Sequence, residues 1–233
     1  MSDGAARGIA GPTRLDLVLY AAVRGLVHAF ARLLWRVRVE GRENLPATGS
    51  YVLAPVHRSN VDTIVAACVT RRRLRFMGKH TMWKWRLPGR FFTALGGFPV
   101  RRGTADREAL RTCVEVIQTG EPLVLFPEGT RREGPVVEDL FDGAAYLAAR
   151  TGVPIVPVGI GGSAVAMPRG AKFVHPARIQ VIVGEPLLPE PVGESGRVPR
   201  RAIRELTERL QKELQRLFDE AQRQSGERGA SGR

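Results

Sequence analysis

The sequence is poor in the residue types that build disulfide frameworks and zinc sites. Only two of its 233 residues are cysteine, Cys68 and Cys113, and only four are histidine. Two cysteines in apolar, helix-like surroundings cannot form a disulfide framework, so we expect buried and reduced thiols. The sequence has no Cys-x-x-Cys motif and no cysteine–histidine cluster, so we expect no zinc or other metal site.

The sequence also lacks an uninterrupted apolar run of the ~20 residues that a membrane-spanning helix needs. Its most apolar stretch, residues 15–35, is interrupted by Arg24, His28 and Arg32. Together with Arg36, these side chains recur at every fourth position and form one basic stripe on a helix. The pattern predicts a helix that lies on a membrane surface with its basic side towards the headgroups, or else an ordinary helix packed on the domain.

Acidic residues are scarce relative to basic ones. The 23 Asp and Glu residues face 36 Lys and Arg residues, which gives a formal net charge of +13. Such an excess predicts an anionic partner, namely nucleic acid, a lipid headgroup surface or phosphorylated small molecules. A hydrophobic content of 43% is sufficient for a buried core, which excludes a fully disordered chain.

The basic charge is concentrated in residues 71–102, where ten Lys and Arg residues occur without any acidic residue. Trp83 and Trp85 lie among them, and basic residues mixed with tryptophan are typical of surfaces that meet an anionic leaflet. Nucleic acid would use the same residue types, but the sequence has no known nucleic-acid motif. We therefore predict a bilayer surface as partner, no nucleic acid, and a peripheral or monotopic location on the cytoplasmic face of the cell membrane. The membrane-facing residues are expected to be Trp83, Trp85, Arg24 and Arg32.

Short apolar segments alternate with helical ones along most of the chain. This alternation predicts an α/β fold with a mostly parallel central sheet flanked by helices and preceded by an N-terminal amphipathic helical extension. The expected strands are residues 35–40, 51–56, 74–77, 98–100, 122–126, 154–160 and 179–183, and the expected helices include 61–69, 106–118, 140–149 and a long one after Pro199. The long helix is expected to be amphipathic, with the apolar stripe Ile203, Leu206, Leu210, Leu214 and Leu217. The expected divisions are a disordered lead-in over 1–12, a membrane-associating helix over 13–36, one catalytic-size domain over 37–222 and a polar tail over 223–233.

His57 directly follows a predicted buried strand, which is where α/β sheets place their sites. Asp62 comes five residues later. On a continuous helix the two side chains would diverge, so they can meet only if His57 lies in the turn and Asp62 in the first helical turn. An ionised aspartate bonded to one imidazole nitrogen would make the other nitrogen a base. The alternative, which the spacing alone favours, is a surface histidine beside a capping aspartate.

Two further polar segments follow predicted strands, and the one after residues 122–126 should therefore lie on the same rim of the sheet as His57. The turn after residues 122–126 contains Glu128, which can accept hydrogen bonds from hydroxyl groups, and Arg131, which can pair with phosphate. The same residues also fit a common Pro-Glu-Gly turn. Arg101 and Arg102 end another strand and should point to opposite sides, so one of them can bind phosphate while the other is solvated.

Taken together, these segments resemble the family of 1-acylglycerol-3-phosphate and glycerol-3-phosphate acyltransferases over roughly residues 51–186. The family pattern is His-x4-Asp, usually with a serine two residues after the histidine, then Gly…Arg, Glu-Gly-Thr-Arg and Val-Pro-Ile-Val-Pro-Val. In this sequence the four motifs are His57 to Asp62, Gly96 to Arg102, Glu128 to Arg131 and Val153 to Val158. Their order and spacing agree with the family, which reverses the preference for a surface histidine.

The resemblance implies the glycerolipid acyltransferase fold and a role for each matching residue. His57 is the implied general base and Asp62 the residue that orients it. Arg102 is the implied ligand of the acceptor's phosphate. No cofactor or metal is implied, because acyl-CoA or an acyl carrier protein thioester serves as co-substrate. The implied substrate-binding residues are Ser59, Lys79, Arg102, Glu128, Gly129, Thr130 and Arg131.

The resemblance therefore implies an acyltransferase that acts on a lysophospholipid, most simply 1-acylglycerol 3-phosphate, and produces phosphatidic acid for phospholipid synthesis. Val56 replaces an asparagine that is frequent in the family, and the segment 140–143 lacks the lysine of the family's Phe-Lys-x-Gly. These departures leave open glycerol 3-phosphate, another lysophospholipid or a lyso-ornithine lipid as acceptor. A non-catalytic polybasic protein that binds lipid or nucleic acid is the alternative from another class.

Overall fold

A seven-stranded sheet forms the centre of the molecule. A computed structural model of the chain describes residues 11–100, 106–191 and 198–226. The strand order is β1-β7-β6-β2-β5-β3-β4, and every neighbouring pair is parallel except β6 and β7. The prediction of a mostly parallel sheet is thus confirmed. The strands are β1 (Arg38–Glu40), β2 (Val52–Pro55), β3 (Arg75–Lys79), β4 (Gly97–Val100), β5 (Leu123–Val124), β6 (Ile155–Gly161) and β7 (Gln180–Val183).

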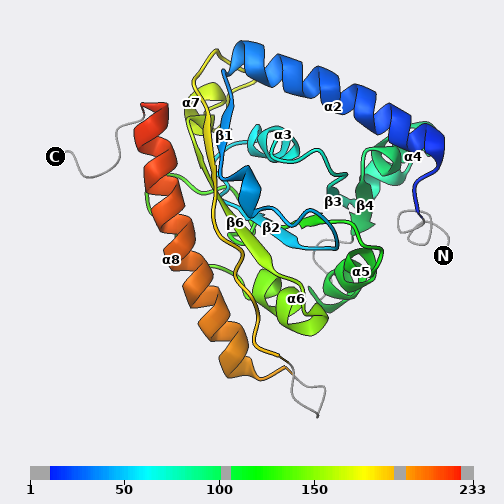
Figure 1. The fold of residues 1–233 in the computed structure, drawn as a ribbon. Coiled ribbons are helices and arrows are strands. Elements are labelled where there is room, and N and C mark those ends of the chain that lie inside the picture. The colour runs from blue at the N-terminus through cyan, green and yellow to red at the C-terminus, as the bar shows by residue number, and fades with distance from the viewer. Residues whose placement is uncertain (1–10, 101–105, 192–197, 227–233) are drawn as a thin grey trace.

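Helices cover both faces of this sheet, as Figure 1 shows. One face carries α5 (Asp106–Gln118), α6 (Gly143–Thr151) and α8 (Arg200–Ser225). The other face carries α2 (Arg14–Leu34), α3 (Asp62–Ala67) and α4 (Arg86–Ala94). The short elements are α7 (Ser163–Ala166) after β6 and the 3-10 helices η1 (Arg42–Asn44) and η2 (His80–Trp83).

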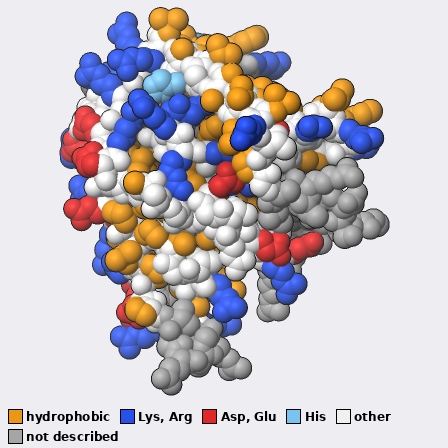
Figure 2. Space-filling model, turned by 45° about the vertical axis from the view of Figure 1, so that its right-hand side comes forward, with side chains coloured by type: hydrophobic (Ala, Val, Ile, Leu, Met, Phe, Trp, Pro, Cys, Tyr) orange, Lys and Arg blue, Asp and Glu red, His pale blue; other side chains and the backbone are white. Residues whose placement is uncertain are grey.

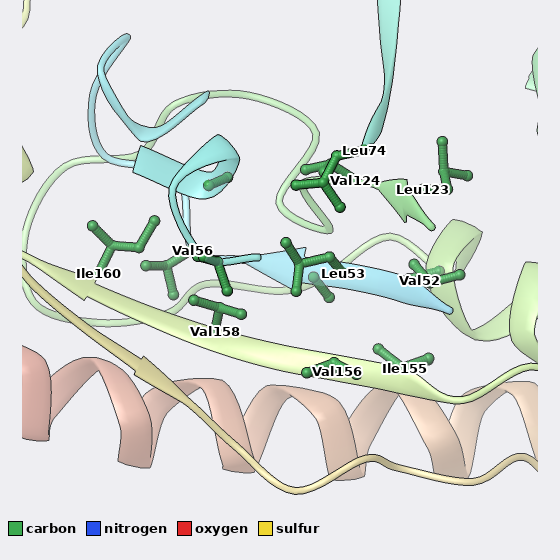
Figure 3. Close-up of a cluster of buried hydrophobic side chains, with 14 of the residues drawn as sticks. Val52, Leu53, Val56, Leu74, Leu123, Val124, Ile155, Val156, Val158 and Ile160 are labelled. Atoms are coloured by element: carbon green, nitrogen blue, oxygen red, sulfur yellow. The ribbon is translucent and has the colours of Figure 1, made fainter. Parts of the chain in front are cut away.

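The core lies on both faces of β2 and β6, where every residue of the two strands is buried. Figure 3 shows the side chains of these strands stacked with those of β5 and with Leu74, the residue before β3, while α8 runs beneath β6. A strand covered on both faces is apolar throughout, which explains why these segments read as continuous apolar runs in the sequence. Cys68 and Cys113 are free and buried, as predicted, and burial raises the pKa of the Cys113 thiol to about 12.

Helix α8 packs closely along β6. Its predicted apolar stripe is confirmed, because Leu206, Leu210, Leu214 and Leu217 are all buried. The helix continues through residues 223–225, which were expected to belong to the polar tail, and it ends at Gly226 with a left-handed backbone. Residues 227–233 of that tail lie outside the described residues.

Helix α2 has one face on the domain and one face exposed. Thr13 and Asp16 form a capping box at its start, and the hydroxyl of Tyr20 accepts the Leu74 N–H at 3.2 Å. By length and composition it is also a helix that could cross a membrane, with 11% of its most apolar window buried. The helix thus docks on the domain, as one of the two alternatives predicted, and its other side is apolar and exposed; its contact with a membrane surface stays a prediction.

The approach of α8 to β6 generates a first prediction. A β-carbon added at Gly159 would lie 2.3 Å from the carbonyl oxygen of Leu217, so Gly159→Ala should lower the free energy of unfolding by about 1–3 kcal/mol. The matched control is Gly25→Ala in α2, where nothing lies within 4 Å of the added carbon and alanine should be neutral or stabilising by up to ~1 kcal/mol. Chemical denaturation measures both effects. Equal midpoints for the two variants would contradict the close packing of α8.

Candidate active site

The loop between β2 and α3 brings His57 and Asp62 together. The Nδ1 atom of His57 lies 3.0 Å from Oδ2 of Asp62, which is the first residue of α3. His57 is in the turn and Asp62 in the first helical turn, as the spacing requires if the two side chains are to meet. A carboxylate only accepts hydrogen bonds, so it assigns the proton of the neutral ring to Nδ1 and leaves Nε2 as the basic nitrogen.

Asp62 also organises the backbone of this loop. Its Oδ2 accepts the N–H groups of Arg58 and Ser59, each at 2.6 Å, and the residue is fully buried. The carboxylate thus shapes the turn that holds His57 in addition to bonding its ring. Hydrogen bonds from backbone amides to a carboxylate are charge-assisted and stronger than bonds between neutral groups.

The ring of Phe126 stacks on the ring of His57. The two ring centroids are 4.1 Å apart and the planes are inclined by 25°. The His57 side chain is 17% exposed, so the site is only partly open to solvent. Sequence analysis missed this role of Phe126, because its ring is indistinguishable in the sequence from an apolar residue that ends a buried strand.

The Glu-Gly-Thr-Arg segment follows β5 and lies against the His57 loop. Oε1 of Glu128 accepts the backbone N–H of His57 at 2.9 Å, and the N–H of Arg132 donates to the His57 carbonyl at 2.9 Å. The expectation that both segments share one rim of the sheet is therefore confirmed. Gly129 has a φ of +68°, a left-handed conformation that favours glycine in this turn.

The carboxylate of Glu128 does not lie free in the site. It is fully buried, and both of its oxygens accept hydrogen bonds from Nη1 of Arg58, at 2.8 and 2.5 Å. The sequence alone did not single out Arg58, because an arginine beside a histidine cannot be distinguished in the sequence from a solvated charge. The implied contact of Glu128 with the acceptor stays a prediction, whereas its contacts in the structure are with Arg58 and the backbone of His57.

The other predicted substrate-binding residues are spread around this rim. Lys79 is exposed at the end of β3, Thr130 is exposed and Arg131 is half-buried. Ser59 is buried, and its hydroxyl donates to the Met167 carbonyl at 2.8 Å. Arg101 and Arg102 lie outside the described residues.

The four residues predicted to face the membrane divide into two pairs. Trp85 and Arg32 are exposed. The indole N–H of Trp83 instead donates to the Thr93 hydroxyl at 2.9 Å, and Nε of Arg24 donates to the Thr70 carbonyl at 3.0 Å. Trp83 and Arg24 thus make contacts within the domain, which the even spacing of basic and aromatic residues could not reveal.

The geometry of the dyad generates a second prediction. At a pH where the His57 ring of the wild-type protein is neutral, ¹⁵N NMR of labelled histidine should show the ring protonated at Nδ1. In Asp62→Asn the side chain gains an NH2 group that can donate to an unprotonated Nδ1, so the ring should populate the Nε2–H tautomer as well. The exposed His80 serves as an internal control whose signals should not change. A wild-type His57 protonated at Nε2 would contradict the arrangement described here.

Comparisons with known proteins show what this chain is similar to. A family model described as Acyltransferase matches residues 36–161. A 1-acyl-sn-glycerol-3-phosphate acyltransferase of Bacillus subtilis is 29% identical over 152 residues, which cover 65% of this chain and 73% of that protein. The enzyme of that name from Escherichia coli is 25% identical, covering 88% of this chain and 84% of its own.

Two further relatives define the extent of the similarity. The chloroplast enzyme LPAT1 of Arabidopsis thaliana, also a 1-acyl-sn-glycerol-3-phosphate acyltransferase, is 27% identical over 73% of this chain. The chain spans about half of that relative, 51% of its length. The crystal structure of the acyltransferase PlsC from Thermotoga maritima shares the fold, with a TM-score of 0.66, 24% identity and coverage of 92% of this chain and 85% of the other.

The matched region contains the site. Residues 36–161 comprise more than half of the 233 residues and include β2, the His57–Asp62 turn, β5 and the segment around Glu128. Among the described residues, no three His, Cys, Asp or Glu side chains gather as a metal site would require. On the strength of the matched region, this chain belongs to the Acyltransferase family.

Proposed function

We propose that the protein transfers a fatty acyl group from a thioester, acyl-CoA or acyl carrier protein, to the free hydroxyl of 1-acylglycerol 3-phosphate, producing phosphatidic acid. The observation that carries the proposal is the His57–Asp62 pair at 3.0 Å, placed at the rim of the sheet in a chain of this family. The names of the bacterial and plant relatives support this choice of acceptor.

The geometry supports a direct transfer of the acyl group. Nε2 of His57 removes the hydroxyl proton as the hydroxyl oxygen attacks the thioester carbonyl carbon. The carbon–sulfur bond then breaks and the thiolate leaves. The thiolate takes the proton from the imidazolium of His57. The products are an ester and a free thiol, and the enzyme returns to its starting state.

An acyl-enzyme intermediate is not needed in this mechanism. The thiols of Cys68 and Cys113 are buried, and the Ser59 hydroxyl is bonded to a backbone carbonyl. None of these groups is an activated nucleophile beside His57. For the phosphate of the acceptor, the residues proposed are Arg102, together with Lys79 and Arg131 at the same rim.

The exposed apolar side of α2 is the proposed membrane contact. Its most exposed residues recur along one side of the helix: Leu15 (70% exposed), Val18 (66%), Leu26 (73%) and Leu33 (87%). Figure 2 shows hydrophobic side chains gathered along the upper part of the molecule, with Lys and Arg beside them. An amphipathic helix of this kind buries its apolar side at the headgroup boundary, and Trp85 and Leu87 of the α4 region extend the exposed apolar surface.

A panel assay tests the reaction. Purified protein is incubated with labelled acyl-CoA or acyl carrier protein and with 1-acylglycerol 3-phosphate, glycerol 3-phosphate, a lysophosphatidylcholine or a lyso-ornithine lipid, and the products are identified by mass. We expect phosphatidic acid as the main product and a loss of about 10²–10⁴-fold in His57→Ala, the range of general-base catalysis. Near-normal turnover in a folded His57→Ala protein would overturn the mechanism, and a different main product would overturn the acceptor.

Membrane contact is tested with vesicles and two tryptophan variants. Trp85→Ala should weaken flotation with anionic vesicles, because Trp85 is 71% exposed. Trp83→Ala is the matched control. Its main effect should be on the free energy of unfolding and not on vesicle binding, because the indole of Trp83 is bonded to Thr93. Added salt should weaken binding without abolishing it, since apolar burial is not screened. Complete release of the intact protein by salt alone would mean that the apolar side of α2 does not enter the bilayer.

A further inference from the structure

The guanidinium of Arg58 is buried at the junction of four segments. Its side chain is 3% exposed. Nε donates to the carbonyl of Gly134 at 3.2 Å, Nη2 to that of Val136 at 3.0 Å, and Nη1 to that of His57 at 3.2 Å as well as to Glu128. Its central carbon lies 4.7 Å from the centre of the Phe218 ring in α8.

A buried charge with this many partners is tightly held. Arginine has five N–H donors in a planar fork, and their directions are fixed relative to one another. Here the fork joins the His57 loop, the turn after β5, the segment 134–136 and α8. Loss of one partner of a buried ion pair leaves the other charge uncompensated, so the pair acts as a unit.

The pair reaches His57 through its backbone. The same oxygen of Glu128 that accepts from Arg58 also accepts the His57 N–H at 2.9 Å. Arg58 and the Arg132 N–H both donate to the His57 carbonyl. Both polar backbone groups of His57 are thus bound by this network, while its ring is bound by Asp62 and stacked on Phe126.

Helix α8 holds the segment that completes the network. The side-chain oxygen of Gln215 accepts the Val137 N–H at 2.7 Å, and its NH2 group donates to the Pro135 carbonyl at 3.0 Å. Gln211 donates to the Val137 carbonyl at 3.2 Å. The carbonyls of Gly134 and Val136 that accept from Arg58 are therefore fixed in place by a helix on the far face of the sheet.

We propose that Arg58 is a positioning residue for the general base His57, and that Glu128 acts as its buried partner in that task. The proposal rests on the proposed function for its effect on turnover. The reaction requires Nε2 of His57 to lie within hydrogen-bond reach of the acceptor hydroxyl, and a misplacement of about 1 Å can cost on the order of 10²-fold in rate. The backbone of His57 is held by Arg58 and Glu128, and its ring by Asp62.

Steady-state kinetics of Arg58→Gln, Glu128→Gln and the double variant test the proposal. Each single variant should lower kcat about 10–100-fold and leave the acceptor KM within about threefold. The kcat of the double variant should be no lower than that of the slower single variant, because the two residues act as a unit. Glu138→Gln is the matched control in the same loop: it breaks a partly exposed pair with Arg132 and should stay within about twofold of wild type. A rise in acceptor KM with Glu128→Gln alone would overturn the proposal and make Glu128 an acceptor ligand.

A second variant separates positioning from stability. Arg58→Met/Glu128→Leu replaces the pair by apolar side chains of similar size, which often preserves the fold of a protein with a buried ion pair. The variant should fold but keep a low kcat, since its side chains at positions 58 and 128 no longer form hydrogen bonds with the backbone of His57. Wild-type turnover in this folded variant would overturn the proposal, because the pair would then serve stability only.

NMR of the His57 ring gives a readout that does not depend on activity. In wild type the ring signals should be sharp and single, and in Arg58→Gln they should broaden or double, while those of His80 stay unchanged. This result supports positioning even if the wild type acylates none of the acceptors in the panel, which would count against the proposed function alone. Unchanged His57 signals in a folded Arg58→Gln protein would overturn the positioning role.

Discussion

The site depends on the central place of β2 in the sheet. The strand is hydrogen-bonded to β5 on one edge and to β6 on the other, and its residues are buried on both faces. Because β2 and β5 run parallel, the turns that follow them emerge side by side. His57 and Glu128, which are 71 residues apart in the chain, therefore share a hydrogen bond.

Two buried carboxylates serve this rim in different ways. Asp62 receives backbone N–H groups and the imidazole, so its charge is offset mainly by dipoles and remains available to the ring. Glu128 is paired with a guanidinium, so its charge is neutralised locally. Buried charges are tolerated only with such partners. The difference explains why one carboxylate is suited to orient a base and the other to hold a loop.

One face of α2 packs on the domain, and the other is the proposed membrane contact. Tyr20 and Ala31 are buried against the domain, whereas the opposite side of the helix is apolar and exposed. Arg24, a member of the predicted basic stripe, bonds to the carbonyl of Thr70. The helix therefore presents leucine and valine outward. In the proposed membrane contact, the exposed cations beside it supply the attraction to an anionic surface.

The sequence by itself determined the sheet, the apolar stripe of α8 and the place of the dyad. Alternating apolar segments require strands covered by helices, and the spacing of His57 and Asp62 allows contact only across a strand-to-helix turn. Local patterns carry this information because each depends on residues that are close in the sequence.

Only the tertiary structure decided what Arg58, Phe126, Glu128 and Trp83 contact. Whether a charge is solvated or buried depends on partners supplied by distant segments, here the turn after β5, residues 134–136 and α8. The partly exposed pair of Arg132 and Glu138 consists of the same two residue types as the buried pair of Arg58 and Glu128. The physical difference between them is burial, because a charge removed from water must be matched by partners that no local pattern specifies.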